Sequence, residues 1–287
     1  MNTKFYLLAV IALVTALSSI VLAEDKVVRY PRPETLLDQR VEYPLQLLRL
    51  AFSKVSGEYE LIPTSQVMPQ GRALVQLNHG VDVDVVWSMT STEREFKLLP
   101  VRIPIYKGLI GWRLFLVNKQ ELGHFQDEMS ISKLRSFQLV QGHDWPDTQI
   151  LRANGFNVLG IPSYNSMFAM ISRSRVDLFP RSIVEIWAEA ENHKANGIVV
   201  EPTKVLIYPA ALYYFVTPGN TRLSVALEKG LRAALEDGSF DALFQQYHSN
   251  LINRARLDER HKYYLDNPTL PIGTPIKEEQ LWFSVKQ

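Results

Sequence analysis

The sequence predicts an α/β fold with two lobes. Segments with strand and helix character alternate over short connections in two successive series, the first within residues 27–87 and the second within residues 137–200. Such alternation indicates βαβ units and sheets that are parallel for the most part. Residues 24–287 are also long for one hydrophobic core and comfortable for two. We therefore expect two compact bodies joined by short connections.

The first series contains three strands and two helices. Val27–Tyr30 is rich in β-branched and aromatic residues, and Pro31 and Pro33 halt this strand. A helix follows near residue 43, with apolar residues spaced along one face. The remaining elements are a strand at Leu61–Pro63, a helix over 67–79 that Gly80 closes, and a strand over Val81–Trp87.

The second series alternates more regularly. Two segments that we expect to be extended, Ile103–Ile110 and Gly111–Val117, precede it. Its strands are predicted at Phe137–Val140, Val158–Ile161, Val176–Phe179 and Ile198–Val200, and its helices at 145–154, 165–173 and 182–192.

Beyond residue 200 the pattern returns to helices without a new sheet. Leu206–Val216 is predicted to be an apolar, aromatic-rich strand that Pro209 interrupts. Two amphipathic helices follow, and Asp237-Gly238 separates them. The Pro-rich segment 264–287 predicts an extended tail that Leu281, Trp282 and Phe283 hold on the surface.

Residues 1–23 predict export through a secretory signal peptide. Lys4 precedes a long apolar run, and Val21 and Ala23 are small residues at the −3 and −1 positions of a cleavage site. An uncleaved membrane anchor is the alternative, because the apolar stretch approaches the length that spans a bilayer. Ser18 and Ser19 favour cleavage. We therefore expect a soluble protein of the periplasm.

The composition excludes several kinds of chemistry. The chain has no cysteine, which excludes disulfides, thiolate nucleophiles, cysteine metal sites and a lipid-anchored form. The six histidines lack H-x-x-x-H spacing, and neither a G-x-S-x-G motif nor a phosphate-binding glycine loop occurs. Without residues 1–23, basic and acidic residues are equal in number and form no basic stripe. We expect no cofactor, no metal site and no nucleic-acid partner.

Three motifs accompany this order of elements. Residues 83–94 (Val-Asp-Val-Val-Trp-Ser-Met-Thr-Ser-Thr-Glu-Arg) combine a strand, a polar loop and a Thr-x-Arg-type ending. Ile103-Pro104-Ile105-Tyr106 contains a Pro-Tyr turn, and Gly238-Ser239-Phe240 opens a C-terminal helix. In these features residues 27–250 resemble a divergent member of periplasmic solute-binding protein family 3, the substrate-binding proteins of amino-acid ABC transporters. The tail after about residue 255 has no counterpart in the resemblance.

The resemblance implies the type 2 periplasmic-binding-protein fold. In that fold lobe 2 is inserted into lobe 1, and two crossover strands connect the lobes, here near 117–121 and 203–209. The implied organisation is a signal peptide (1–23), a first part of lobe 1 (24–118), lobe 2 (119–205), a second part of lobe 1 (206–254) and a C-terminal extension (255–287).

Loops at the carboxyl ends of strands supply the candidate ligand-binding residues, because open α/β sheets bind ligands there. Arg94 resembles the family's arginine that grips a ligand α-carboxylate, which a guanidinium can do with two parallel hydrogen bonds. The alternative is a surface arginine paired with Glu93 or Glu95. Ser88 and Thr90 would supply hydroxyl groups beside Arg94. The other candidates are Tyr30, Arg32 and Trp87 in lobe 1, and Gly142 and His143 in lobe 2.

The junction that contains Gly142 resembles the helix start where the family binds a ligand anion. Here Asp144 and Asp147 fit a helix cap and a first-turn acid, which would satisfy the backbone donors without a ligand. Trp145 either stacks on the ligand or packs under the loop.

Arg181 is the main departure from the family. Many members carry at this strand end an Asp that pairs with the α-amino group of the ligand, whereas an arginine repels an ammonium group and cannot accept its hydrogen bond. Two interpretations follow. Arg181 and Arg94 together hold a dianion such as a dicarboxylate, or Arg181 pairs with Glu185 one helical turn onward and leaves the cleft nearly neutral.

The resemblance implies that the protein binds a small, anionic or amino-acid-like solute by hinge closure and delivers it to an inner-membrane permease. One alternative is a periplasmic subunit that senses a ligand for a membrane receptor. Another is an enzyme similar to cyclohexadienyl dehydratases, with Glu185 or Asp144 as the acid in the cleft. We expect a monomeric binding protein without catalytic residues.

Overall fold

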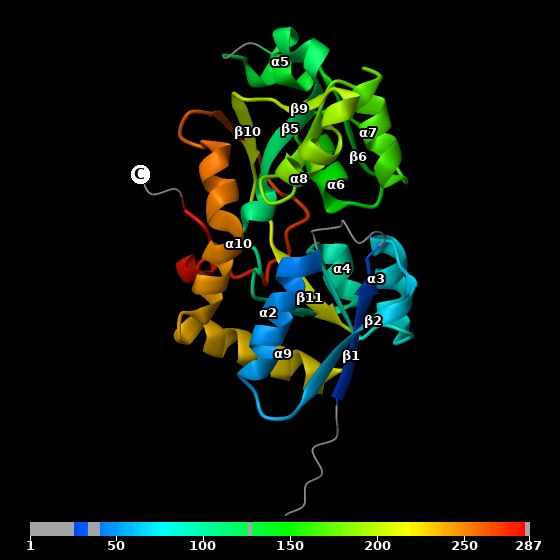
Figure 1. The fold of residues 1–287 in the computed structure, drawn as a ribbon, viewed down its shortest axis with the longest axis vertical. Helices are drawn as coiled ribbons and strands as arrows, with labels where there is room; N and C mark the ends of the chain where they lie inside the picture. The colour runs from blue at the N-terminus through cyan, green and yellow to red at the C-terminus, as the bar shows by residue number, and fades with distance from the viewer. Residues whose placement is uncertain (1–25, 34–40, 126–127, 285–287) are drawn as a thin grey trace, which may run out of the picture.

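The computed structural model describes residues 26–33, 41–125 and 128–284. They form an α/β structure with two lobes, which are the lower body (lobe 1) and the upper body (lobe 2) in Figure 1. The predicted signal peptide, residues 1–23, lies outside the described residues. None of the described helices is long and apolar enough to cross a membrane.

Lobe 1 contains two small sheets with helices packed against them. In one sheet β1 and β2 run parallel, and in the other β11 lies between β3 and β4, antiparallel to both. The strands are β1 (Lys26–Arg32), β2 (Tyr59–Val67), β3 (Val85–Met89), β4 (Leu99–Val101) and β11 (Leu212–Val216). The helices are α2 (Glu42–Ser53), α3 (Gln70–His79), α4 (Thr92–Lys97), α9 (Thr221–Glu236) and α10 (Ser239–Ala255).

Lobe 2 is organised around β5, which pairs antiparallel with β8, β9 and β10. A separate parallel pair, β6 and β7, lies beside this sheet. The strands are β5 (Trp112–Asn118), β6 (Gln138–Gly142), β7 (Asn157–Ile161), β8 (Phe179–Ser182), β9 (Ile198–Val200), β10 (Lys204–Ile207) and β12 (His261–Tyr264). The helices are α5 (Ile131–Arg135), α6 (Pro146–Ala153), α7 (Tyr164–Ser172) and α8 (Ile186–Asn192).

The chain passes between the sheets of the two lobes twice, over residues 102–111 and 208–211. β5 follows the first passage and β10 precedes the second, and these two strands pair with each other. At Gly111 the two passages touch, because a Cβ there would lie 2.0 Å from the carbonyl oxygen of Tyr208. The lobe boundaries at 118/119 and 205/206 stay a prediction.

Most predicted strands and helices form close to their predicted positions, but two regions and the direction of several strands differ. Ile103–Ile110 is not a strand. It contains turns and leads into a short 3₁₀ helix, η3 (Leu109–Gly111), and Lys107 and Gly108 have positive φ angles of 47° and 77°. Leu206–Val216 forms two strands, with the second passage between them. The sheets are also less parallel than predicted, because the strands beside the passages return antiparallel to their neighbours.

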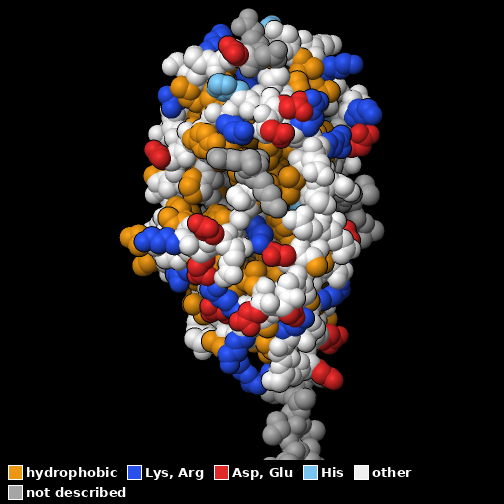
Figure 2. Space-filling view, turned by 90° about the vertical axis from the view of Figure 1, so that its left-hand side faces the viewer, with side chains coloured by type: hydrophobic (Ala, Val, Ile, Leu, Met, Phe, Trp, Pro, Cys, Tyr) orange, Lys and Arg blue, Asp and Glu red, His pale blue; other side chains and the backbone are white. Residues whose placement is uncertain are grey.

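The C-terminal segment 261–284 contacts both lobes. β12 extends the lobe 2 sheet parallel to β10. Farther along, the carbonyl oxygen of Thr269 accepts a hydrogen bond from the Thr92 N–H of lobe 1 at 3.0 Å. The predicted anchors are in place, since Leu281 is buried and the Phe283 ring contacts the Trp112 ring with centroids 5.7 Å apart. On the face shown in Figure 2, Lys and Arg side chains are interspersed with Asp and Glu side chains.

Candidate functional site

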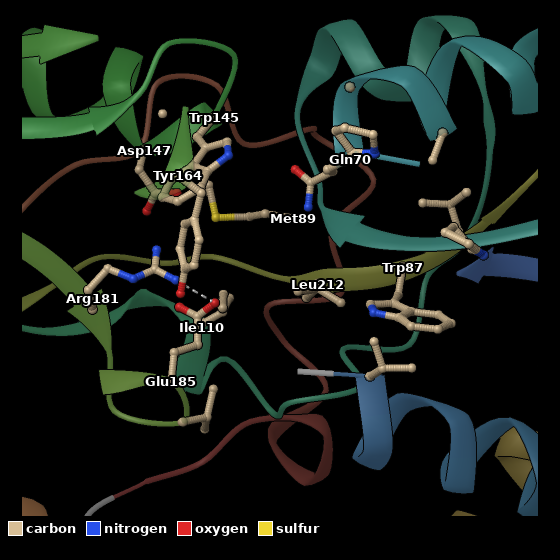
Figure 3. A pocket seen from close by; sticks show the side chains of 18 of the residues that line it. Gln70, Trp87, Met89, Ile110, Trp145, Asp147, Tyr164, Arg181, Glu185 and Leu212 are labelled. Carbon is tan, nitrogen blue, oxygen red and sulfur yellow. Dashed lines mark ion pairs between the residues drawn. The ribbon is translucent and has the colours of Figure 1, made fainter. Parts of the chain in front are cut away.

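A cavity of about 570 Å³ lies between the two lobes. This volume is in the range of sites that enclose small organic ligands. Figure 3 shows residues of lobe 2 on one side of the open space and residues of lobe 1 on the other. The labelled lobe 2 residues are Trp145, Asp147, Tyr164, Arg181 and Glu185, and those of lobe 1 are Gln70, Trp87, Met89 and Leu212.

Arg94 lines this cavity and bridges the two lobes. Ser91 caps α4 by accepting a hydrogen bond from the Arg94 N–H at 3.2 Å, which fixes Arg94 in the first helical turn. The Nη1 of Arg94 donates to Ser88 Oγ at 2.6 Å and to the carbonyl oxygen of Met89 at 2.8 Å. Its Nη2 donates across the cavity to the carbonyl oxygen of Asp144 at 3.1 Å. The guanidinium therefore faces neutral oxygens.

Arg94 does not pair with a neighbouring glutamate. Glu93 lies 2.7 Å from Lys97 Nζ, and Glu95 lies 2.6 Å from Arg102 Nη2. In the described part of the chain no carboxylate comes within ion-pair distance of the Arg94 guanidinium. Desolvation lowers the pKa of Arg94 to about 10, and a carboxylate beside it would act in the opposite direction.

The predicted hydroxyl residues lie behind Arg94. Ser88 and Thr90 are both buried, and neither is a cavity-lining residue in the described structure. Ser88 accepts the Arg94 hydrogen bond, and Thr90 Oγ1 donates to Glu95 Oε1 at 2.7 Å. Ser88 thus positions the candidate anion-binding group, while Thr90 holds the acid that pairs with Arg102.

The aromatic candidates in lobe 1 occupy two layers. Trp87 lines the cavity, and Tyr30 packs beneath it with ring centroids 6.2 Å apart. Arg32 also lines the cavity, and its Nε donates to the carbonyl oxygen of Thr64 at 2.7 Å. Trp87 and Arg32 are therefore in reach of a ligand, and Tyr30 supports Trp87.

In lobe 2, Gly142 lines the cavity, whereas His143 does not. A Cβ at Gly142 would lie 2.5 Å from the Trp145 indole, so only glycine allows Trp145 to pack onto this strand end. Trp145 also stacks against Arg181, whose guanidinium carbon lies 4.8 Å from the ring centroid. Trp145 therefore packs against this strand end and Arg181, and it also lines the cavity, so a ligand contact stays a prediction. The His143 side chain is 57% exposed, because the loop directs it away from the cavity.

The predicted cap at Asp144 is wrong. Helix α6 has Trp145 at its N-cap position and no side-chain cap. The Asp144 carboxylate reaches instead toward the first turn of α3 in lobe 1, where a Cβ at Gly71 would lie 2.7 Å from its Oδ2. Together with the Arg94 hydrogen bond, this contact makes Asp144 a bridge between the lobes.

Arg181 is buried and neutralised by two carboxylates. Its Nη2 lies 3.0 Å from Glu185 Oε1, the ion pair drawn in Figure 3, and 2.6 Å from Glu189 Oε1. Burial alone would lower the pKa of Arg181, but these carboxylates raise it well above its usual value. The predicted Arg181–Glu185 pair therefore forms.

Sequence reasoning missed Arg113, a second buried arginine in this wall. It projects from β5, and its Nη2 lies 2.5 Å from Asp147 Oδ1, while Tyr208 also donates to the same carboxylate. Glu185 Oε2 lies 3.4 Å from Arg113 Nη1. Although burial opposes it, the Asp147 carboxylate raises the pKa of Arg113. The available signal was a lone charge inside the apolar run Trp112–Val117.

Four charged residues of this wall, together with Glu189 behind Arg181, form one connected cluster, which we call the lobe 2 charge cluster: Arg113, Arg181, Asp147, Glu185 and Glu189. Three carboxylates against two guanidiniums leave a formal excess of one negative charge. Arg94 carries a positive charge on the facing side of the cavity. The two sides are therefore complementary to a ligand with separated negative and positive groups. Within the described residues, no group of His, Asp or Glu side chains could hold a metal ion.

A scan against protein-family models and a search of curated protein sequences give no match. Solved structures do match. An ancestral arginine-binding protein bound to arginine is 16% identical, with a TM-score of 0.58 over 78% of this chain and 98% of that one. A histidine kinase sensor domain similar to periplasmic binding proteins is 15% identical, with a TM-score of 0.57 over 78% and 96%. A periplasmic binding protein of Salmonella typhimurium with high arginine specificity is 12% identical, with a TM-score of 0.56 over 77% and 99%.

These likenesses show the fold. The chain has the two-lobed type 2 periplasmic-binding-protein fold that the sequence resemblance implies.

Proposed function

We propose that this protein binds a small amino-acid-like solute in the cavity between its lobes and carries it in the periplasm. The observation that carries the proposal is Arg94, a guanidinium that lines the cavity without a carboxylate partner among the described residues. A ligand carboxylate would supply that partner through charge-assisted hydrogen bonds. The solved structures with this fold include proteins bound to arginine and to lysine.

The charges support a zwitterion over a dianion. Arg113 and Arg181 are already paired within the lobe 2 charge cluster, and the Arg32 guanidinium donates to the carbonyl oxygen of Thr64, so we assign the ligand carboxylate to Arg94. The excess negative charge of that cluster favours a cationic group on the ligand. The repulsion expected between Arg181 and an ammonium group is thus offset by its two carboxylate partners.

Closure brings the two halves of the site together. Arg94 belongs to lobe 1, and its hydrogen bond to Asp144 crosses to lobe 2. The passages 102–111 and 208–211 are the connections about which the lobes would rotate. A ligand held by Arg94 and by the lobe 2 charge cluster would stabilise the closed form, because it contacts both lobes only there.

Replacement of Arg94 tests the proposal. A thermal-shift screen over amino acids and dicarboxylates identifies a ligand, because binding to the folded protein raises its melting temperature. Arg94→Ala should then weaken binding by about 2–5 kcal/mol in calorimetry. Arg72→Ala is the control, since Arg72 is exposed on α3 and donates to Gln66. An unchanged affinity in Arg94→Ala would remove Arg94 from the site.

Delivery to an inner-membrane permease is the role that we propose for the loaded form, and a membrane receptor is the alternative partner. We propose binding without catalysis. Two residues are candidate acids for a dehydratase. Glu185 forms ion pairs with Arg113 and Arg181, and the Asp144 carboxylate contacts Gly71 of the other lobe. Turnover of a prephenate-like acid on incubation with the protein would contradict this part of the proposal.

A further inference from the structure

We propose that the solute carries a bulky apolar or aromatic body, which lies against the apolar part of the cavity lining. This inference rests on the proposed binding function and adds the ligand class. The residues that would contact the body are Trp87, Met89, Ile110 and Leu212, which we call the apolar wall; all four line the cavity and are labelled in Figure 3.

The sheet of lobe 1 builds this wall. β3 and β11 run antiparallel with Met89 opposite Leu212, so these two side chains are cross-strand neighbours. Trp87 lies two residues before Met89 and therefore on the same face of β3. Ile110 comes from η3 at the first passage between the lobes and is 5% exposed. The wall thus rests on paired strands and on the connection between the lobes.

The space beside the wall is larger than the charged groups of an amino acid require. The lobes already touch through Arg94 and Asp144, and the cavity still measures about 570 Å³. Cavities of this size enclose ligands with a substantial body, and apolar lining gives most of their binding free energy. The solute should therefore extend well beyond its carboxylate and ammonium groups.

The four side chains of the apolar wall offer little to a polar body, although polar residues such as Gln70 line other parts of the cavity. An indole ring, a thioether and two aliphatic side chains offer no strong acceptor for a guanidinium or an amide. A polar group placed there would lose its water and leave its hydrogen-bonding capacity unsatisfied. The preference should therefore differ from that of the similar structures that bind arginine, glutamine or lysine.

A series of zwitterions with different bodies tests the inference by calorimetry. We expect L-tryptophan and L-leucine to bind at least about tenfold more tightly than L-alanine, L-arginine or L-glutamine, since even one methylene group in an apolar site is worth roughly tenfold or more. Trp87→Ala should weaken tryptophan binding by at least about tenfold while changing alanine binding little. Trp112→Ala is the matched control, because Trp112 packs against Phe283 outside the cavity.

Leu212→Asn provides a second variant that changes the wall without a large cavity. It should lower the affinity for leucine and raise that for glutamine, because the new amide can pair with the ligand amide. If the unaltered protein binds arginine or glutamine most tightly and Trp87→Ala changes no affinity, the inferred ligand class is overturned. A loss of affinity in Arg94→Ala would in that case still support the proposed binding function. Absence of binding by every zwitterion tested would overturn both.

Discussion

The imidazole of His248 lies buried among four aromatic rings of lobe 1. Its ring centroid is 4.4 Å from that of Tyr43, 5.3 Å from Tyr106 and 4.9 Å from Phe244, and Tyr247 is also close. Within the described residues neither ring nitrogen has a hydrogen-bond partner. Desolvation lowers the pKa of His248 to about 3 in the folded protein.

This burial predicts a loss of stability in mild acid. In the unfolded chain His248 has an ordinary pKa of about 6.5, so below that pH the unfolded state binds a proton that the folded state excludes. The contribution of neutral His248 is complete above pH 6.5 and declines as the pH falls toward 3. Between pH 7 and pH 5 the unfolding free energy should fall by about 2 kcal/mol from this residue.

Urea unfolding at a series of pH values checks this prediction. His248→Phe removes the titrating group and keeps an aromatic ring in the same surroundings. The difference between the two stability curves should grow below pH 6.5 in favour of the variant. Parallel curves would mean that the His248 ring is accessible to protons in the folded protein.

The Arg113–Asp147 pair gives a second prediction for single residues. Asp147→Ala leaves the Arg113 guanidinium buried beside Tyr208 without its closest carboxylate, which should cost about 3–5 kcal/mol of unfolding free energy. The double variant Arg113→Met with Asp147→Leu should recover most of this loss, because it removes both charges. If Asp147→Ala lowers the unfolding free energy by less than about 1 kcal/mol, the Arg113–Asp147 pair contributes no more than an exposed ion pair does, and the prediction is wrong.

These residues also show how far the site could be predicted. Arg94 could be proposed because it follows a strand and a polar loop, where α/β sheets bind ligands, and because it resembles the carboxylate-binding arginine of the solute-binding family. Arg113 could not, since its partners Asp147 and Glu185 come from distant elements and only the folded chain brings them together. The same applies to Asp144, whose contact with Gly71 is made between lobes.

At the scale of elements, α2 and α9 pack closely at one glycine. A Cβ at Gly230 of α9 would lie 2.0 Å from the carbonyl oxygen of Ala51 in α2. Helix propensity alone predicts that Gly230→Ala stabilises α9 by about 1 kcal/mol. The contact is with backbone, which cannot rotate aside, so we expect the opposite sign.

Gly230→Ala should therefore lower the unfolding free energy by about 1–3 kcal/mol, the usual cost of overpacking. Lys229→Ala is the matched control, since Lys229 is exposed and adjacent on the same helix. Thermal unfolding of both variants measures the difference. Stabilisation by Gly230→Ala would show that the two helices can separate without loss of packing.

The helices and several strands could be predicted because their apolar spacing is periodic. α3 ends at Gly80, which adopts the left-handed conformation that closes a helix, as predicted. Ile103–Ile110 was misassigned because an apolar run without a period does not distinguish a strand from a buried turn. β8 (Phe179–Ser182) begins three residues later than predicted, because pairing with β5 sets its register.

At the scale of the whole molecule, a segment beyond the two passages also joins the lobes. The carbonyl oxygen of Asp266 accepts a hydrogen bond from Asn154 Nδ2 of lobe 2 at 2.8 Å. Three residues later Thr269 binds the N–H of Thr92 in lobe 1. The region between them, anchored by Asn267 to the Pro209 carbonyl oxygen at 2.8 Å, acts as a short strap. Sequence reasoning placed this tail on the surface, but its two lobe contacts depend on tertiary structure.

The strap should limit how far the lobes open. Inserting about six Gly and Ser residues between Asp266 and Asn267 would let its ends separate by roughly 13 Å while leaving both attachments intact. We expect a broader distribution of distances between the lobes. Affinity for the solute should fall, because closed conformations become a smaller fraction of the ensemble.

Spin labels on two introduced cysteines measure the distance between the lobes. The chain has no cysteine of its own, so Val75→Cys and Asn157→Cys would place one exposed label on lobe 1 and one on lobe 2. The same insertion between Gly219 and Asn220, a turn where a Cβ on Gly219 would meet nothing within 4 Å, is the control for added chain length. Broadening only with the strap insertion would assign the restraint to residues 266–269. If both insertions give the same distribution of inter-lobe distances, the strap does not restrain the lobes, and the two passages alone limit how far they open.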